Sequence, residues 1–320
     1  GAEACYATAS GMSAVFTSLI ALLESGDAVV AAKGLFGSCF VILDELLPRW
    51  GIRTTFVDGD DLDAWEKALS DGAKVVFFES PSNPMQGLVD ITAVSDLAHQ
   101  AGATVVVDNV FATPILQKPL DLGADVVVYS TTKHIDGQGR TLGGAILGTE
   151  QYIVEDVQPF IRHTGPALSP FNAWVLTKSL ETLPLRVNAE VASALALAEA
   201  LEELDGVERV WYPYLASHPQ HDLARSQMAS GGTVVTFSVR GGKDAAFRLL
   251  NALEVIDISN NLGDSKSLVT HPASTTHRRL GSDVRADMGI TDGVVRVSVG
   301  LESIDDLISD VTQAVEVATS

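Results

Sequence analysis

Short apolar runs rich in β-branched residues alternate with helical or loop stretches in the first half of the chain. The runs expected to form strands cover residues 28–32, 52–57, 74–79, 103–108, 124–129 and 143–147. Two of them, around 105–107 and 126–128, are apolar at every position, which is typical of strands buried on both faces. Helical stretches at 62–69 and 91–101 fill two of the gaps. The pattern predicts an α/β domain with a mostly parallel sheet and helices on both faces.

The pattern changes after Phe171. A long helical tract extends to about Leu204, and Pro184 is expected to kink or break it. The elements expected beyond it are a strand at 233–239, a helix near 244–253, a strand at 294–299 and a last helix near 304–318. We interpret residues 1–183 as a large domain and 184–320 as a smaller C-terminal α+β domain, and a length of 320 residues fits two domains.

Composition and charge exclude several classes of protein. The chain is 46% hydrophobic and 19% charged, which excludes a disordered protein. A net charge of −20 argues against nucleic acid or an anionic membrane as the partner, because either would be repelled. No apolar run approaches the roughly 20 residues that span a bilayer. The two cysteines, Cys5 and Cys39, favour a reducing compartment, so we expect a cytoplasmic protein.

A stretch of small residues, Thr8-Ala9-Ser10-Gly11-Met12, stands directly before a helical run. Small residues let the backbone approach a ligand, and the first N–H groups of a helix have no partner within the helix. The backbone at Gly11 and Met12 is therefore a candidate site for an anion such as a phosphate. The alternative is that Ser10 simply caps the helix.

Polar residues end two of the predicted strands. Asp108 ends one, and Ser130, Thr131, Thr132 and Lys133 follow another. Ligands collect at the carboxyl ends of strands in open α/β sheets, so these side chains are expected to converge. A lysine among hydroxyls can lose its proton and attack a carbonyl carbon, and an aspartate suits a heterocyclic nitrogen that must stay protonated. The set fits pyridoxal phosphate. The alternative is a surface lysine and an aspartate that caps a turn.

Three further residues are candidate ligands. Asn83 lies in the proline-stiffened loop at 79–84, where its amide could bond a ligand, although a rigid turn would also explain the loop. Arg296 is a single cation in a strand of β-branched residues, where a carboxylate ligand would offset its burial; an exposed strand face is the alternative. Phe36 could stack on a flat cofactor or belong to the core.

Two glycine and histidine patterns do not predict a site. The stretch at 137–143 has one residue too many for a dinucleotide fingerprint and precedes a strand, which counts against a dehydrogenase. His218 and His221 are separated by Pro219, which spoils a helical pair of zinc ligands, so no metal is expected.

Three motifs together resemble the Cys/Met-metabolism family of pyridoxal-phosphate enzymes, which has the fold of aspartate aminotransferase. They lie at residues 129–139 (YSTTKHIDGQG), 10–12 (SGM) and 298–302 (SVGLE), and the resemblance covers essentially the whole chain. It implies a seven-stranded sheet. Residues 133–139 and 260–277 resemble the O-succinylhomoserine sulfhydrylase branch more than the cystathionine γ-synthases or γ-lyases.

The resemblance also implies a role for each candidate residue. Lys133 would form a Schiff base with the cofactor and move protons, and Asp108 would pair with the pyridine nitrogen. Arg296, with Asn261, would bind the substrate. The residues that would hold the rest of the cofactor are Gly11, Met12, Ser130 and Thr132 at the phosphate, Asn83 at the ring hydroxyl, and Phe36 in place of the stacking tyrosine of many relatives.

The implied activity is replacement of the succinyl group of O-succinylhomoserine by sulfide, which gives homocysteine in methionine biosynthesis. Use of cysteine instead of sulfide, a γ-lyase outcome and an O-acetyl donor stay open, as does an α/β protein that merely binds an anionic metabolite. The family also implies a homotetramer built from dimers that share active sites. Relatives carry an upstream Tyr and Arg motif that reaches the partner's phosphate site. Gly1 lies only seven residues before Thr8, so we expect that arm to be deleted here or disordered.

Overall fold

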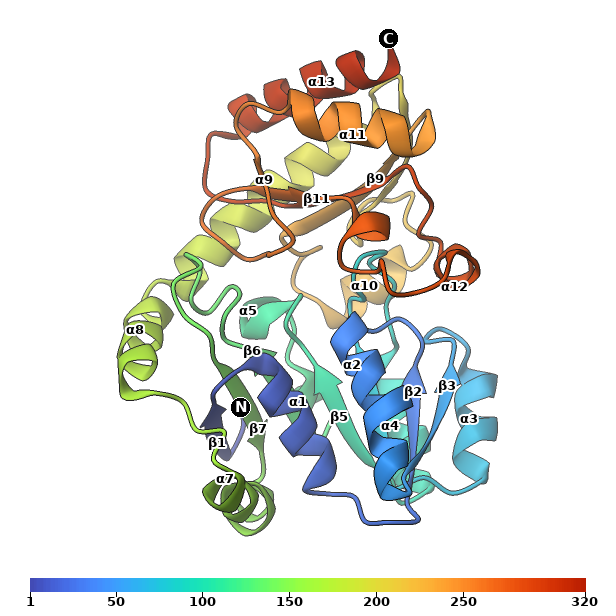
Figure 1. The fold of residues 1–320 in the computed structure, drawn as a ribbon, viewed down its shortest axis with the longest axis vertical. Coiled ribbons are helices and arrows are strands. Elements are labelled where there is room, and N and C mark those ends of the chain that lie inside the picture. The colour runs from blue at the N-terminus through green and yellow to red at the C-terminus, as the bar shows by residue number, and fades with distance from the viewer. The chain divides into compact units, whose positions relative to one another are not determined.

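Seven strands form one sheet in the first part of the protein, in a computed structural model that describes all residues 1–320. Their order is β1-β7-β6-β5-β4-β2-β3. The bounds are β1 (Ala4–Thr8), β2 (Ala28–Ala32), β3 (Arg53–Val57), β4 (Val75–Glu79), β5 (Thr104–Asp108), β6 (Val126–Ser130) and β7 (Gly144–Gly148). Strand β7 pairs antiparallel with both of its neighbours, β1 and β6, and all the other pairs are parallel. The predicted α/β class with a mostly parallel sheet is confirmed (Figure 1).

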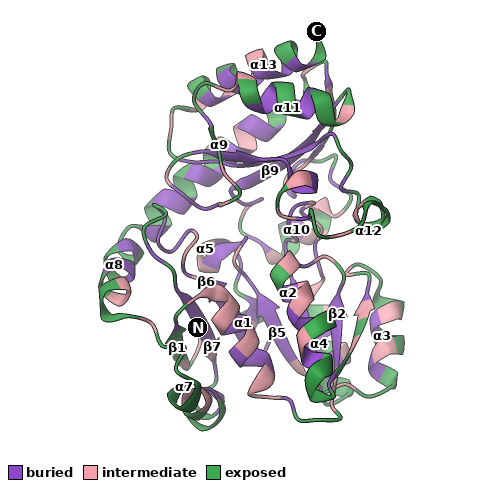
Figure 2. Cartoon of the chain, viewed as in Figure 1, coloured by how far each residue is buried: buried purple, intermediate pink, exposed green.

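Helices cover both faces of this sheet, because alternate residues of its strands β2, β4 and β5 pack into two different apolar clusters. On β4, Val75 and Phe77 pack in the cluster that contains Leu19, whereas Val76 and Phe78 pack in the cluster that contains Trp65. Figure 2 shows strands such as β2 and β5 as buried. The helices of this part are α1 (Gly11–Ile20), α2 (Gly37–Val41), η1 (Ile42–Leu46), η2 (Leu47–Trp50), α3 (Leu62–Ser70), α4 (Ile91–Gln100), α5 (Thr113–Leu116), η3 (Pro119–Leu122), α6 (Glu150–Tyr152), η4 (Ile153–Val157), α7 (Gln158–Thr164) and α8 (Pro170–Leu180).

Some strands were not predicted from the sequence, including three in the second unit, at Val207–Trp211, Asp257–Ile258 and Leu268–Thr270. Strand β1 was not expected, because an edge strand with alternating exposure carries no continuous apolar run. The break expected near Pro184 is present: α8 ends at Leu180, and the next helix, α9 (Leu183–Glu202), begins one residue before the proline. A proline in the first turn costs little, because the N–H that it lacks has no partner within the helix.

The chain divides into two compact units. The first contains Gly1–Asn83, Gly87–Asp136 and Arg140–Leu180, and the second contains Pro84–Gln86, Gly137–Gly139 and Glu181–Ser320. Two short loops of the first half, including the glycine-rich one after Lys133, therefore belong to the second unit.

A five-stranded sheet forms the centre of the second unit, in the order β10-β11-β12-β9-β8. One apolar cluster joins it to α9, α11 and α13. No helix of the protein, not even the 20-residue α9, is long and apolar enough to cross a membrane. The other elements are β8 (Val207–Trp211), α10 (His221–Gln227), β9 (Val234–Val239), α11 (Gly242–Ala252), β10 (Asp257–Ile258), β11 (Leu268–Thr270), η5 (Pro272–Ser274), α12 (Ser282–Asp287), β12 (Val294–Ser298) and α13 (Ile304–Thr319).

Candidate active site

The start of α1 lies against the end of β6. Ser10 caps the helix, and its Oγ accepts the N–H of Ser13 at 3.1 Å. The N–H groups of Gly11 and Met12 precede the first bond of the helix, as an anion site requires. A Cβ on Gly11 would lie 2.5 Å from the Cβ of Ser130, so only glycine allows this approach. The structure thus brings the predicted anion-binding backbone next to the serine hydroxyl.

Asp108 ends β5 on the neighbouring strand. It is paired with Val128, two residues before Ser130, and its Oδ1 accepts the N–H of Val110 at 3.1 Å. Burial raises the pKa of its carboxyl to about 6, and the bond from Val110 opposes that shift only in part. A buried carboxylate is stabilised by a cation. A protonated ring nitrogen is a cation of suitable size for this place.

Lys133 occupies a tight turn directly after β6. Its backbone N–H donates to the carbonyl oxygen of Ser130 at 3.2 Å, and its side chain is half-buried. The Oγ1 of Thr132 accepts the N–H of Gly143 at 3.1 Å and donates to the carbonyl oxygen of Gly143 at 3.3 Å. The single hydroxyl proton of Thr132 is thus directed at the protein, and it must rotate if this residue is to donate to a phosphate.

Asp136 fixes the end of this turn, a role that the sequence did not suggest. Its side chain is fully buried. Oδ2 accepts the N–H groups of Arg140 at 2.5 Å and Thr141 at 3.3 Å, and Oδ1 accepts Nε of Arg140 at 3.0 Å. These charge-assisted bonds hold the chain three residues beyond Lys133.

Glu79, at the end of β4, joins two loops that carry predicted cofactor residues. Its Oε1 accepts the N–H of Asn83 at 2.6 Å, and its Oε2 accepts the N–H of Phe36 at 3.0 Å. It is paired with Asp108 across β4 and β5. Burial is the main cause that raises the pKa of the Cys39 thiol, and the charges of Asp108 and Glu79 raise this pKa further. This role of Glu79 was not predicted from the sequence. The signal was a carboxylate that ends an otherwise apolar strand.

Replacing Glu79 by glutamine is expected to lower the free energy of unfolding by about 1–3 kcal/mol, because one amide NH₂ would face a backbone N–H and leave that donor unsatisfied. Chemical denaturation measures the change. Glu66→Gln on the exposed face of α3 is the matched control, and we expect it to be within about 0.5 kcal/mol of the wild type. Equal stabilities of the two variants would contradict the role assigned to Glu79.

Arg296 is buried in the second unit, so an exposed strand face does not explain it. Its residue is 1% exposed, and it lies on β12 between Thr270 of β11 and Thr236 of β9. Its Nη2 donates to the carbonyl oxygens of Asn260 and Asn261, each at 3.0 Å. The structure brings Asn261 and Arg296 together through the backbone of the asparagine.

The glycines after Lys133 are explained by close packing within the second unit. Gly137 has a φ of +69°, and a Cβ on it would lie 1.9 Å from Nη1 of Arg186. The carbonyl oxygen of Gly137 accepts the N–H of Ser265 at 2.7 Å. The side chain of Arg186 thus packs against the backbone of this loop, and no pattern in the sequence marks Arg186 as its partner.

Comparison with known proteins identifies the family of the chain. The family model described as "Cys/Met metabolism PLP-dependent enzyme" matches residues 1–316. A protein of Mycobacterium tuberculosis (strain CDC 1551 / Oshkosh) named O-succinylhomoserine sulfhydrylase is 64% identical over 98% of this chain and 78% of its own length. One of the same name from Pseudomonas aeruginosa (strain PAO1) is 51% identical over 98% of this chain and 77% of its own length.

A solved structure gives the same result for the fold. Cystathionine gamma synthase from Xanthomonas oryzae pv. oryzae superposes with a TM-score of 0.96 at 34% identity, and the match covers 98% of this chain and 81% of that one. The chain therefore belongs to the Cys/Met-metabolism family of pyridoxal-phosphate-dependent enzymes.

Proposed function

We propose that this enzyme replaces the succinyl group of O-succinylhomoserine by sulfide and so forms homocysteine for methionine biosynthesis. The observation that carries the proposal is the identity of 64% and 51%, over 98% of the chain, to two proteins named O-succinylhomoserine sulfhydrylase. The site in the first unit supports the cofactor that this chemistry needs.

The residues present fit pyridoxal phosphate. Gly11 and Met12 offer backbone N–H groups beside the Ser130 hydroxyl, which suits the phosphate. Asp108 offers a buried carboxylate for the ring nitrogen. We assign Asn83 to the ring hydroxyl and Phe36 to the ring face, in loops that Glu79 fixes. When bound, the cofactor supplies an electron sink for carbanion chemistry at the amino-acid carbons.

Lys133 is the proposed base. Its amine would remove the proton from Cα of the substrate and then assist removal of one from Cβ. The Cγ–O bond breaks, succinate leaves with the bonding electrons, and the sulfur of sulfide forms a bond to the same Cγ. The amine would then return one proton to Cβ and one to Cα, which completes homocysteine. Short turns on both sides, closed at Ser130 and Asp136, restrict where this amine can lie.

Arg296 is the proposed ligand of the substrate α-carboxylate. The Asn260 and Asn261 carbonyl oxygens accept from one nitrogen of its guanidinium, which orients the planar group. A planar guanidinium pairs with a carboxylate through two parallel bonds. Asn261 then contributes to substrate binding by holding the arginine.

A cystathionine γ-synthase or γ-lyase activity is the alternative. The solved synthase has nearly the same backbone, with a TM-score of 0.96, so the fold does not discriminate between acceptors. The side chains that admit sulfide or cysteine decide between them.

With O-succinylhomoserine as the donor, we expect kcat/KM for sulfide to exceed kcat/KM for cysteine by about tenfold or more, the equivalent of about 1.4 kcal/mol in transition-state stabilisation. Parallel assays of homocysteine and cystathionine measure both values. A control without acceptor reports release of a 2-oxo acid. Preference for cysteine would assign the chain to the synthases, and release of 2-oxo acid at the same rate without acceptor would assign it to the lyases.

Sulfide as the acceptor, a homotetramer of dimers and a cytoplasmic location are also parts of the proposal. The names of the relatives support the first, and the family resemblance supports the second. The third rests on a chain in which both Cys5 and Cys39 are free thiols.

A further inference from the structure

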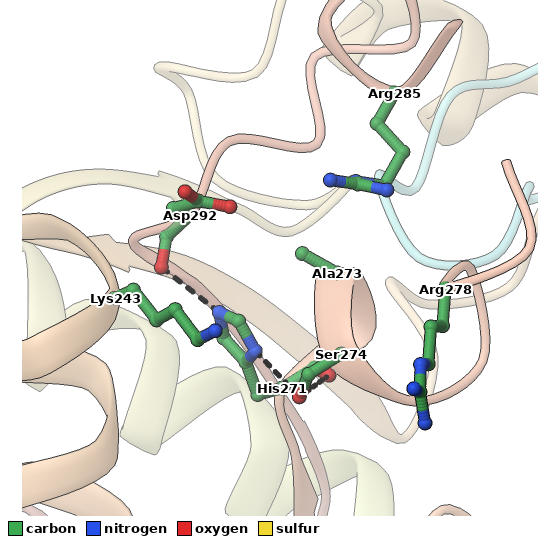
Figure 3. Close-up of a pocket in the computed structure, with 7 residues that line it drawn as sticks. All are labelled: Lys243, His271, Ala273, Ser274, Arg278, Arg285 and Asp292. Carbon is green, nitrogen blue, oxygen red and sulfur yellow. Dashed lines mark hydrogen bonds between the residues drawn. The ribbon is translucent and has the colours of Figure 1, made fainter. Parts of the chain in front are cut away.

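A basic pocket of about 270 Å³ lies in the second unit and has no part in the proposed reaction. Three cationic side chains line it: Lys243 from α11, Arg285 from α12, and Arg278 from the segment between η5 and α12. Figure 3 shows these three side chains around His271 and Ser274. Asp292 is the only carboxylate in the lining.

None of the three cations forms an ion pair with a carboxylate of the protein. Nη1 of Arg285 donates to the carbonyl oxygen of Leu280 at 2.6 Å, and Nζ of Lys243 lies 5.4 Å from the centre of the Phe247 ring. The side chain of Arg278 makes no hydrogen bond within the chain. The chain has 41 acidic and 21 basic residues, so its net charge is negative. A cavity lined by three unpaired cations is therefore unusual in this protein. With Asp292, the lining carries a formal charge of about +2.

The imidazole of His271, which lines the pocket, is held in a fixed orientation by two hydrogen bonds. Its Nε2 lies 2.9 Å from the carbonyl oxygen of Asp292, and its Nδ1 lies 2.8 Å from Oγ of Ser274 (Figure 3). A carbonyl oxygen can only accept, so Nε2 carries the hydrogen. In the neutral ring, Nδ1 then accepts the Ser274 hydroxyl proton. The imidazole is therefore held between the segments that carry Ser274 and Asp292.

We propose that this pocket binds a small dianion, a phosphate monoester or a dicarboxylate, between Lys243, Arg278 and Arg285. Guanidinium groups bind both classes of anion through paired bonds, and the ammonium of Lys243 adds a mobile point charge. A dianion would neutralise the lining. The inference concerns a second site and does not depend on the reaction proposed above.

Calorimetric titration of the holoenzyme tests this, with inorganic phosphate and succinate in separate experiments at low ionic strength. The bound cofactor occupies the phosphate site of the first unit, so phosphate reports on other sites. We expect saturable binding of at least one anion. Binding should weaken about tenfold or more in Arg278→Ala and in Lys243→Ala, because each loses a charge-assisted contact. Phosphate binding alone would indicate phosphate esters, and succinate binding alone would indicate dicarboxylates.

Arg279→Ala is the matched control, because it removes the same charge from the next residue, which does not line the pocket. Its affinity should stay within about twofold of the wild type, since screened surface charges contribute little. Thermal unfolding shows that all three variants are folded. Absence of saturable binding by either anion would overturn the proposal. So would equal losses in Arg278→Ala and Arg279→Ala, or succinate binding that none of the variants changes.

Discussion

Replacing Lys133 by alanine is expected to abolish turnover and to leave the fold intact. The amine is the only proposed base for the Cα proton, and a methyl group cannot replace it. Loss of this group should reduce kcat by about 10⁴-fold or more, since proton transfer and covalent attachment of the cofactor are lost together. The half-buried side chain is not part of an apolar cluster, so little stability is lost.

Two measurements accompany the assay. The visible absorbance of cofactor bound to a lysine should disappear in Lys133→Ala, whereas circular dichroism should be unchanged. Lys118→Ala removes an exposed lysine from the same unit and should behave as the wild type. Turnover of Lys133→Ala at the wild-type rate would show that another group is the base.

Replacing Asp108 by asparagine is expected to keep the cofactor but to lower kcat by about 10²–10³-fold, the range for loss of one preorganised electrostatic contact. The neutral amide has nearly the same shape and can still accept the N–H of Val110. It cannot hold a proton on the ring nitrogen, and the electron sink is then weaker. The loss should appear in kcat more than in cofactor affinity, because charge develops during the reaction.

The same substitution is expected to stabilise the protein when the cofactor has been removed. Burial raises the pKa of Asp108 to about 6 in the folded chain, above its ordinary value. When folding raises the pKa of a carboxyl group, the folded state is destabilised as this group loses its proton. Stability therefore falls as the pH rises from the pKa of the group in the unfolded chain to its pKa in the folded chain. As the pH rises from about 4 to 6, the free energy of unfolding of the wild-type apoenzyme should therefore fall by about 2–3 kcal/mol. The Asp108→Asn apoenzyme should not show this fall.

Denaturation of the apoenzyme at pH 4.5 and pH 7.5 measures this difference. Asp96→Asn, on the exposed face of α4, is the control and should follow the wild type at both pH values. An apoenzyme of Asp108→Asn that is less stable than the wild type at pH 7.5 would show that the carboxylate serves the fold. Unchanged turnover would refute its pairing with the cofactor.

The strands that position the site were predictable because they are buried on both faces. Continuous apolar runs such as Val105-Val106-Val107 leave few alternatives, and a polar residue directly after such a run marks an edge where ligands collect. Asp108 and Lys133 were chosen as candidate residues in this way. Strand β1 was missed because its residues alternate between exposed and partly buried, and its pairing with β7 joins segments about 140 residues apart.

The contacts that hold the site could not be predicted, because they join segments that are distant in the sequence. Glu79 accepts a backbone N–H from Phe36, 43 residues away, and no local pattern marks Phe36 as a donor. Arg296 and Gly137 show the same limit: a lone cation and a glycine were noticed, but their partners depend on tertiary packing. Sequence patterns predict which residue types lie at the ends of strands, whereas the partners that hold these residues in place depend on the tertiary fold.

Peptide mapping after borohydride reduction tests the central claim most directly. Reduction fixes the cofactor to the lysine that carries it, and mass spectrometry of a digest of the holoenzyme then locates the added pyridoxyl phosphate. We predict that the modification lies on Lys133 alone among the lysines of the chain. A pyridoxyl group on any other lysine would contradict the account. So would a holoenzyme that is fully active before reduction but carries no pyridoxyl group on any lysine after it.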